Sequence, residues 1–331
     1  MADYKGIQGY MVQSLASDPT VTEALGQLWY NSSSNVWKVA IEGSGAWSAG
    51  GNLTRPPSTI NSGAGTLTAG LVFGGTPYPY PPVDSTYSEE YDGTSWTEGN
   101  NLPTACHMNA GAGSQTAALS IGGKISTSDQ VFSFEYNGTS WGDGGDLPSG
   151  KSLLGALGIQ TAAMALAGSP APTNTSAYSY DGTSWTEEAT LTIPRISQPG
   201  GAGTTTAGIC FAGENPAASP IEVVETEEWN GTGWSEGGDL NTGRHYVGVG
   251  QGTATDALCV GGSVSPKQQT EIYNGTSWTE TGDLATGRAE MGQSAGINNT
   301  STSWCCGGYP FTNTTEEFAN PVLAIKTVTT S

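Results

Sequence analysis

One recurring position of the sequence carries an unusual share of the positive charge. Four residues after a leucine that recurs along the chain stand four of its ten basic residues, Lys151, Arg195, Arg244 and Arg288. Its two histidines, His107 and His245, directly follow the same position. We consider two roles. Each cation bonds a nearby glutamate or loop carbonyl group, or these six residues form a ligand-binding face for an anionic group, whose attraction would weaken with salt.

The acidic residues are abundant, but their pattern argues against catalysis. Glycosidic hydrolysis needs two carboxyl groups about 5–10 Å apart at one singular site. Here the acids recur with the repeat described below, as Glu90, Glu135, Glu228, Glu271 and Glu317. The sequence also lacks a G-x-S-x-G elbow and a phosphate-binding loop. We therefore expect no enzyme activity, no catalytic residue and no cofactor.

The cysteines do not form a recognisable metal or disulfide pattern. The five of them, an odd number without a C-x-x-C spacing, are Cys106, Cys210, Cys259, Cys305 and Cys306. Cys210, Cys259 and Cys306 lie inside apolar runs, which favours buried free thiols. We expect neither a disulfide framework nor a zinc site, and folding in a reducing compartment.

Net charge excludes some classes of partner. With 30 acidic and 10 basic residues, the chain has a net charge of -20. Such a surface repels nucleic-acid phosphates and anionic membrane surfaces. No apolar run is long enough to span a bilayer, and the opening "MADYKGIQGY" has no basic-then-apolar signal pattern. We expect no nucleic-acid partner, no membrane insertion and no secretion by the usual route.

The elements that would position these residues come from a repeated phrase. It reads "YDGTSW", "YNGTSW", "YDGTSW", "WNGTGW" and "YNGTSW". Together with an earlier tryptophan in "GAWSAGGNL", the residues that mark the repeat are Trp47, Trp96, Trp141, Trp185, Trp234 and Trp278. Their spacing of 44 to 49 residues predicts six units, with a period typical of propeller blades. We expect these tryptophans to be structural and to pack between neighbouring blades.

One unit shows how the phrase would fold. Residues 107–145 parse into four strand-like runs, "HMNAGAG", "TAALSIGG", "QVFSFEY" and "TSWGDGG". Between the last two stands Asn137-Gly138, which predicts a hairpin with a type I′ turn. The Gly- and Ala-rich first run suits an innermost strand, where blades crowd around an axis.

Four strands, a glycine pair after the second, an aromatic residue after the third and a tryptophan in the fourth resemble the kelch repeat. The resemblance covers about residues 45–318. It implies an all-β fold, a six-bladed kelch-like β-propeller over residues 45–319 with four antiparallel strands per blade. Kelch-fold copper oxidases use two histidines and two tyrosines around one ion. His107 and His245 would lie in opposite blades, so we expect no metal site.

The two ends would complete the ring and add to it. The last unit lacks its own tryptophan strand, which predicts that the strand around Trp47 closes the sixth blade. Residues 26–40 predict a hairpin around Asn31–Asn35, and the segment 320–331 predicts one strand. These could pair with each other or extend the last blade. We expect residues 1–44 to form an N-terminal arm and hairpin.

The chain as a whole resembles kelch-like propellers encoded by bacteriophages, especially marine ones. Its "GQLWYNSSSNVWKV" segment is similar to a hairpin that precedes distal domains of phage fibre proteins. The resemblance implies a virion protein, made in the host cytoplasm, with an outward-facing propeller for head decoration, tail-fibre function or adhesion to a host glycan or receptor. Residues 1–44 and 320–331 would dock it onto other head or tail proteins. The alternatives are a carbohydrate-binding or carbohydrate-active propeller and a cellular kelch interaction module.

Overall fold

Every regular element that the structure describes is a β-strand. The computed structural model describes residues 13–18, 27–41, 45–55, 58–59, 62–77, 84–170, 174–248, 250–295, 300–320 and 324–328. No helix in these ranges has the length and apolar character that crossing a membrane requires. The chain divides into two compact units, one of residues 46–319 and one that combines residues 1–45 with 320–331.

The described part of the larger unit contains six four-stranded antiparallel sheets, numbered here as sheets 1 to 6. Sheet 1 is formed by β6 (Ser62–Thr66), β7 (Ala69–Phe73), β9 (Ser88–Tyr91) and β10 (Trp96–Glu98). Sheet 2 is formed by β11 (Ala110–Ser114), β12 (Ala117–Ile121), β15 (Ser133–Tyr136) and β16 (Trp141–Asp143). Sheet 3 is formed by β17 (Gly155–Ile159), β18 (Ala162–Leu166), β19 (Ala177–Tyr180) and β20 (Trp185–Glu187).

The next three sheets follow the same order. Sheet 4 is formed by β21 (Gly200–Thr204), β22 (Ala207–Phe211), β23 (Glu227–Trp229) and β24 (Trp234–Glu236). Sheet 5 is formed by β25 (Gln251–Thr253), β26 (Asp256–Val260), β27 (Thr270–Tyr273) and β28 (Trp278–Glu280). Sheet 6 is formed by β29 (Gly292–Gln293), β30 (Thr302–Cys306), β31 (Thr315–Ala319) and β4 (Ala46–Ala49). Two further two-stranded antiparallel sheets pair β5 (Ser58–Thr59) with β8 (Thr76–Pro77) and β13 (Lys124–Ile125) with β14 (Ser128–Asp129).

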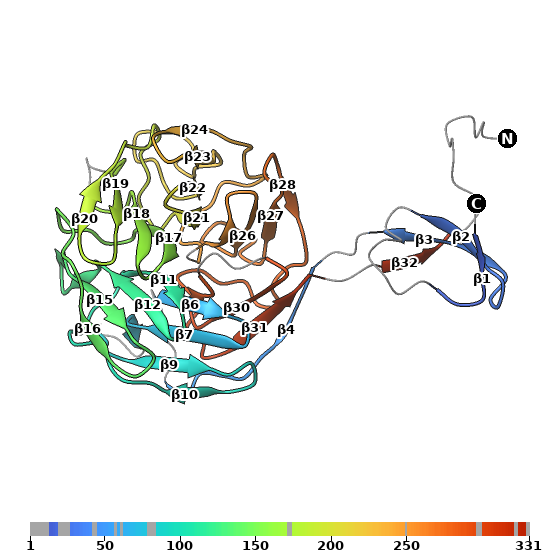
Figure 1. Ribbon diagram of the computed structural model, residues 1–331, viewed down its shortest axis with the longest axis horizontal. Coiled ribbons are helices and arrows are strands. Elements are labelled where there is room, and N and C mark those ends of the chain that lie inside the picture. The colour runs from blue at the N-terminus through green and yellow to red at the C-terminus, as the bar shows by residue number, and fades with distance from the viewer. Residues whose placement is uncertain are drawn as a thin grey trace. The chain divides into compact units, whose positions relative to one another are not determined.

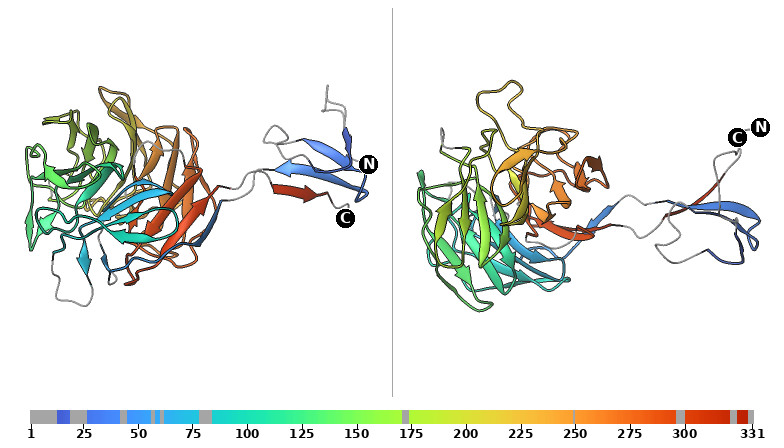
Figure 2. Two further views of the ribbon diagram at one scale, coloured as in Figure 1. Left: turned by 60° about the horizontal axis from the view of Figure 1, so that its bottom comes forward. Right: turned by 45° about the horizontal axis from the view of Figure 1, so that its top comes forward.

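Small residues let the first strands of neighbouring sheets approach closely. A Cβ atom on Gly63 would lie 2.1 Å from the carbonyl oxygen of Gln293, and one on Gly111 would lie 2.3 Å from that of Gly63. Only glycine allows such contacts. Figure 1 shows β6, β11, β17 and β21 near the centre of this unit and β10, β16, β20 and β24 at its periphery, and Figure 2 shows the same unit from two further sides. The arrangement is propeller-like.

The predicted closure of the last sheet by an N-terminal strand is confirmed. In β4, Trp47 pairs with Phe318 and Ala46 pairs with Ala319 of β31. The first strand of this unit in the sequence thus becomes the outermost strand of its last sheet, and β31 does not present an unpaired edge.

Tryptophan side chains connect neighbouring sheets through their indole N–H groups. Trp185 of sheet 3 donates to Ser133 of sheet 2 at 3.0 Å, and Trp278 of sheet 5 donates to Thr226, next to β23 of sheet 4, at 2.9 Å. Trp96 of sheet 1 donates to Thr315 of sheet 6 at 2.8 Å. The last sheet is thereby bonded to the first, so the sheets follow one another in cyclic order.

The hairpin turn in the repeated phrase differs from the prediction. Tyr136 pairs directly with Trp141, so four residues form the loop instead of two. Gly138 has a φ of 85°, whereas Asn137 is not among the residues with positive φ. The Asn137 side-chain oxygen instead accepts hydrogen bonds from the amides of Thr139 and Ser140 at 3.0 and 2.9 Å. The type I′ prediction was therefore wrong, because the side chain caps a longer turn.

The chain ends form a separate sheet, the terminal sheet. Its strand order is β1 (Gln13–Leu15), β2 (Leu28–Asn31), β3 (Val36–Ile41) and β32 (Ala324–Thr327). The predicted hairpin between β2 and β3 is confirmed, and of the two possibilities for the C-terminal strand, β32 pairs with β3. Residues 1–12, 19–26 and 42–44 of the predicted arm lie outside the described residues.

Candidate functional site

The arginines at the recurring cation position are buried inside the sheets. Arg195, Arg244 and Arg288 are each at most 2% exposed. Arg288 donates to the Glu316 carboxylate at 2.6 Å and to the carbonyl groups of Gly307 and Thr314 at 3.2 and 3.0 Å. The glutamate belongs to the third strand of the sheet that follows the arginine in sequence.

The other two arginines use the same set of acceptors. Arg195 donates to Ala212 at 2.8 Å and to Glu227 at 3.3 Å. Arg244 forms a close ion pair with Glu271 and donates to the carbonyl group of Gln269 at 3.0 Å. The predicted ligand-binding face is therefore wrong for these arginines, because their charges are buried and paired within the chain. They instead have the first of the two roles considered from the sequence, in which each cation bonds a glutamate and loop carbonyl groups of the chain itself.

Lys151, in the corresponding loop before sheet 3, is also buried. Burial lowers the pKa of its ammonium group to about 8, against the opposing effect of Asp129 and Glu187. Its charge is therefore withdrawn from the surface as well, and it too departs from the predicted ligand-binding face.

The two histidines are each paired with a carboxylate. His107 Nδ1 lies 2.7 Å from Asp84 Oδ1, and His245 Nε2 lies 3.1 Å from Glu214 Oε1. Burial lowers the pKa of His245, while Glu214 acts in the opposite direction. The histidines belong to loops that precede sheets 2 and 5, and no group of three or more metal-ligating side chains lies together in the described ranges. The geometry does not combine the histidines with the arginines into one site.

The recurring glutamates occupy two different positions of the repeat, which the sequence analysis treated as one position. Glu90, Glu135, Glu228 and Glu317 each accept a hydrogen bond from a tyrosine of the next sheet, namely Tyr136, Tyr180, Tyr273 and Tyr91. Glu271 was wrongly grouped with them. It belongs with Glu227 and Glu316, which hold the arginines. The doubled glutamates in "SEEY", "TEEW" and "TEEF" carried this signal.

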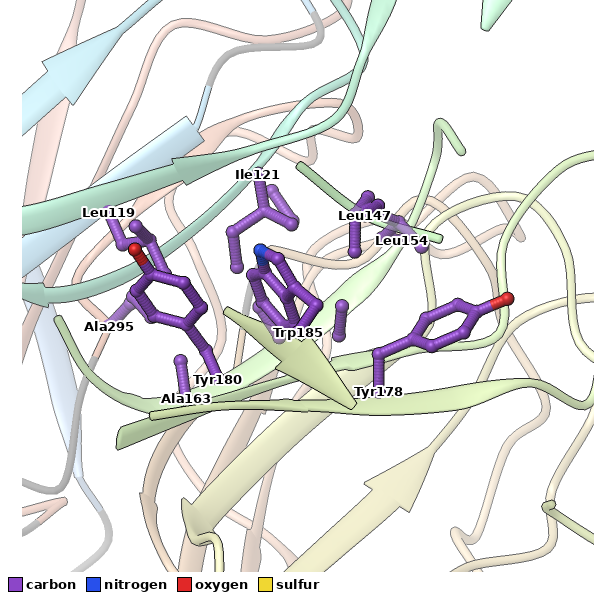
Figure 3. Packing of buried hydrophobic residues seen from close by; sticks show 13 residues of the cluster. Leu119, Ile121, Leu147, Leu154, Ala163, Tyr178, Tyr180, Trp185 and Ala295 are labelled. Carbon is purple, nitrogen blue, oxygen red and sulfur yellow. The ribbon is translucent and has the colours of Figure 1, made fainter. Parts of the chain in front are cut away.

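The motif tryptophans fill the space between sheets. Trp96, Trp141, Trp185 and Trp278 are buried, while Trp47 and Trp234 are half-buried. Figure 3 shows Trp185 facing Ile121 and flanked by Tyr180 and Tyr178, within a cluster that joins sheets 2 and 3. The centres of the Tyr180 and Trp185 rings are 4.9 Å apart. This packing makes them part of the core.

The cysteines lie in the same cores. All five fall in described ranges, and each is buried and free of disulfide bonding. Burial raises the pKa of the thiols of Cys106, Cys210, Cys259 and Cys305 to about 12. The prediction of buried free thiols is confirmed.

The terminal sheet presents an exposed group of aliphatic and aromatic side chains. Leu28 and Tyr30 lie opposite Val39 and Trp37, so these four side chains share one face of the hairpin. Trp37 is 44% exposed and Leu28 is 38% exposed. We call these four residues the open apolar face.

The opposite face of the hairpin is held by one aspartate. Asp18 pairs with Lys38 at 2.6 Å and accepts hydrogen bonds from Asn31 at 2.6 Å and Trp29 at 3.4 Å. The hydrogen bond from Lys38 is the largest cause that lowers the pKa of Asp18. With this face occupied by contacts within the chain, the open apolar face remains the candidate docking surface.

Comparison with known proteins adds no relative to this picture. No protein-family model matches the chain, and no curated protein matches it significantly.

Proposed function

We propose that this protein is a bacteriophage virion protein in which a six-bladed kelch-like β-propeller faces outward, for adhesion or decoration, and the terminal sheet docks onto other virion proteins. The cyclic order of the six sheets and the closure of sheet 6 by β4 support the propeller assignment. The repeated phrase and its resemblance to phage-encoded propellers support the virion assignment.

One observation carries the docking role. The two chain ends form a sheet of their own, and its open apolar face leaves a tryptophan and a leucine exposed. Exposed apolar side chains that cluster on one surface are typical of interaction sites. Polar contacts of Asp18 on the other face hold the hairpin in shape. A virion partner would therefore bind the side that carries Trp37.

The first test is whether the protein belongs to the particle. Mass spectrometry of purified phage particles that encode this chain should find peptides from both compact units, in an amount comparable with known structural proteins. A chain found only in the soluble fraction of infected cells, with none in purified particles, would overturn the proposal.

The second test addresses docking. We expect Trp37→Ser to reduce incorporation into particles by at least about tenfold, a loss equivalent to about 1.4 kcal/mol of binding free energy. The matched control is Tyr309→Ser, which removes another exposed aromatic residue, 47% exposed, from the larger unit. Equal incorporation of both folded variants would contradict the assignment of the docking surface.

A further inference from the structure

Three sheets hold an arginine with one recurring set of acceptors. In sheets 4, 5 and 6 the third-strand glutamate lies opposite a cysteine of the second strand, as Glu271 lies opposite Cys259. The arginine bonds this glutamate and the carbonyl group two residues after that cysteine. In two of these sheets it also bonds the carbonyl group two residues before the glutamate.

Sheet 1 repeats the acceptors without the arginine. Glu89 lies opposite Val72, in the same register, and is 2% exposed. Its carboxylate accepts hydrogen bonds from the amide and hydroxyl groups of Thr54 at 2.8 and 2.9 Å and from the amide of Arg55 at 3.1 Å. The position equivalent to the arginine is Pro57 in the sequence. Within the described ranges no basic side chain forms an ion pair with Glu89.

A pocket occupies this part of sheet 1. Its volume is about 20 Å³, which exceeds the space that one water molecule requires. Its lining includes Glu89 together with Gly74 and Tyr87, whose carbonyl groups correspond to those that hold the arginines elsewhere. Leu53 and Phe73 contribute apolar walls.

The one cation in the pocket lining is engaged elsewhere. The guanidinium group of Arg55 lies 3.8 Å from the centre of the Tyr87 ring and forms an ion pair with Glu98. Glu98 thus balances the charge of Arg55, and the negative charge of Glu89 is left without a counter-ion among the described side chains. Burying a carboxylate in this way is costly unless a cation completes the set.

We propose that the pocket of sheet 1 binds a guanidinium group supplied by another molecule, either the arginine side chain of a partner or a small guanidine. The planar group would donate to Glu89 and to the Gly74 and Tyr87 carbonyl groups, as the chain's own arginines do in sheets 4 to 6. This site is independent of the proposed virion role, since it lies within sheet 1 and does not involve the terminal sheet.

The probe is agmatine, which carries the guanidinium group of arginine without its carboxylate, titrated by calorimetry into the full-length protein. We expect saturable binding that Glu89→Gln weakens about ten- to a hundredfold, the range for a hydrogen bond to a charged group. Glu280→Gln, which neutralises an exposed glutamate of sheet 5, should leave binding unchanged. Absence of binding, or equal loss in both variants, would overturn the proposal.

A second variant tests the site by filling it. Pro57→Arg restores the residue of the repeat and should abolish agmatine binding while raising the thermal midpoint. Unchanged binding to this folded variant would argue against the site. Binding that appears only after Arg55→Ala would also argue against it, because the chain's own arginine would then be the natural occupant.

The source of the guanidinium group is separated by a third measurement. The tripeptide Gly-Arg-Gly, with blocked ends, presents the group as a protein partner would. Binding at least as tight as that of agmatine indicates a partner's arginine, whereas weaker binding of the peptide indicates a small guanidine.

Discussion

At the scale of single residues, the repeated tryptophans fill space between sheets and, where an acceptor exists, donate an indole N–H hydrogen bond to the preceding sheet. Trp185 is 8% exposed and donates to both Ser133 and Gly145 at 3.0 Å. Trp141, by contrast, has a buried indole nitrogen that lacks a hydrogen-bond partner in the described part of the chain. Burial of the ring is therefore the shared feature, and the hydrogen bond is an addition to it.

Replacing Trp185 by Ala should lower the free energy of unfolding by about 3–5 kcal/mol, as for other large aromatic residues removed from a core. Denaturant unfolding of the variant and the natural protein measures this difference. A loss below about 1 kcal/mol, well under that range, would mean that the ring contributes little to the core.

The turn glycine is a second residue whose role is local. Gly138 has a φ of 85°, and an added Cβ would lie 3.3 Å from that of Thr116. Gly138→Ala should therefore cost about 1–2 kcal/mol. Gly142 is the control, because a Cβ there meets nothing within 4 Å and its φ is not in the left-handed region. If both substitutions change the unfolding free energy equally, backbone conformation is not the cause.

At the scale of the elements, buried polar pairs connect the loops to strands and the sheets to each other. Arg244 crosses from the loop before sheet 5 to Glu271 in β27, and Glu271 also accepts hydrogen bonds from the backbone and side chain of Asn241. Removing one charge of a buried pair leaves the other without compensation, whereas removing both does not.

Arg244→Met should therefore cost about 3–5 kcal/mol, and so should Glu271→Leu. The double variant should cost clearly less than their sum, which a double-mutant cycle on unfolding free energies measures. Strict additivity would show that the two side chains do not act as a pair.

The tyrosine–glutamate contacts between sheets predict a dependence on high pH. Desolvation, followed by the hydrogen bond to glutamate, raises the pKa of Tyr136 and Tyr273, the latter to about 12. The neutral phenol is favoured in the folded state, so this contribution to stability is complete below pH 10 and is lost as the pH rises through about 12.

A spectrophotometric titration should show a group of tyrosines that ionise later than ordinary phenols. Tyr273→Phe should reduce this late group by one residue. Ionisation of Tyr273 with the exposed tyrosines in the folded protein would contradict the role of Glu228 as its partner.

Sequence periodicity predicted much at this scale and failed where the answer depends on register. The period of the tryptophans located the strands, and the missing last strand located the partner of β31. The loop length of "YNGTSW" was misjudged because two or four residues can connect the same strands, and only the pairing of Tyr136 with Trp141 decides. For Arg244 the sequence left open both pairing within the chain and exposure on a ligand-binding face, because the sequence around a charged loop residue does not show whether its side chain is buried.

The tyrosine positions show a signal that sequence reasoning could have used. Where the residue at the tyrosine position is instead Trp229 or Phe318, the preceding sheet has Ser179 or Ile272 in place of the glutamate. The two positions change together because the glutamate carboxylate, which lies between two sheets, needs the hydroxyl group of the tyrosine as its hydrogen-bond donor. Comparing the tyrosine position of each repeat with the glutamate position of the repeat before it, instead of aligning all repeats on one another, would have separated the two glutamate positions.

At the scale of the whole molecule, β4 determines whether sheet 6 has four strands. Deleting residues 1–51 removes β4 and leaves β31 with an unpaired edge, which favours association with other chains. We expect this variant to aggregate. Deleting residues 1–44 instead removes the N-terminal part of the terminal sheet but retains β4, and is the control.

Light scattering and thermal unfolding distinguish the two truncations. The shorter deletion should keep the melting temperature of the larger unit. A soluble monomer with unchanged melting after the longer deletion would contradict the importance of β4 for closure.

Closure by β4 also sets a delay during synthesis. Trp47 emerges from the ribosome early, yet its partner Phe318 is made about 270 residues later. At about 5–20 residues per second, translation of that interval takes on the order of tens of seconds. Throughout this time the β4 segment is a strand without a partner, and each intervening sheet can form from contiguous sequence before it. Within the larger unit this most distant pairing is therefore completed last, and the four-residue length of β4 limits what else it can bind in the interval.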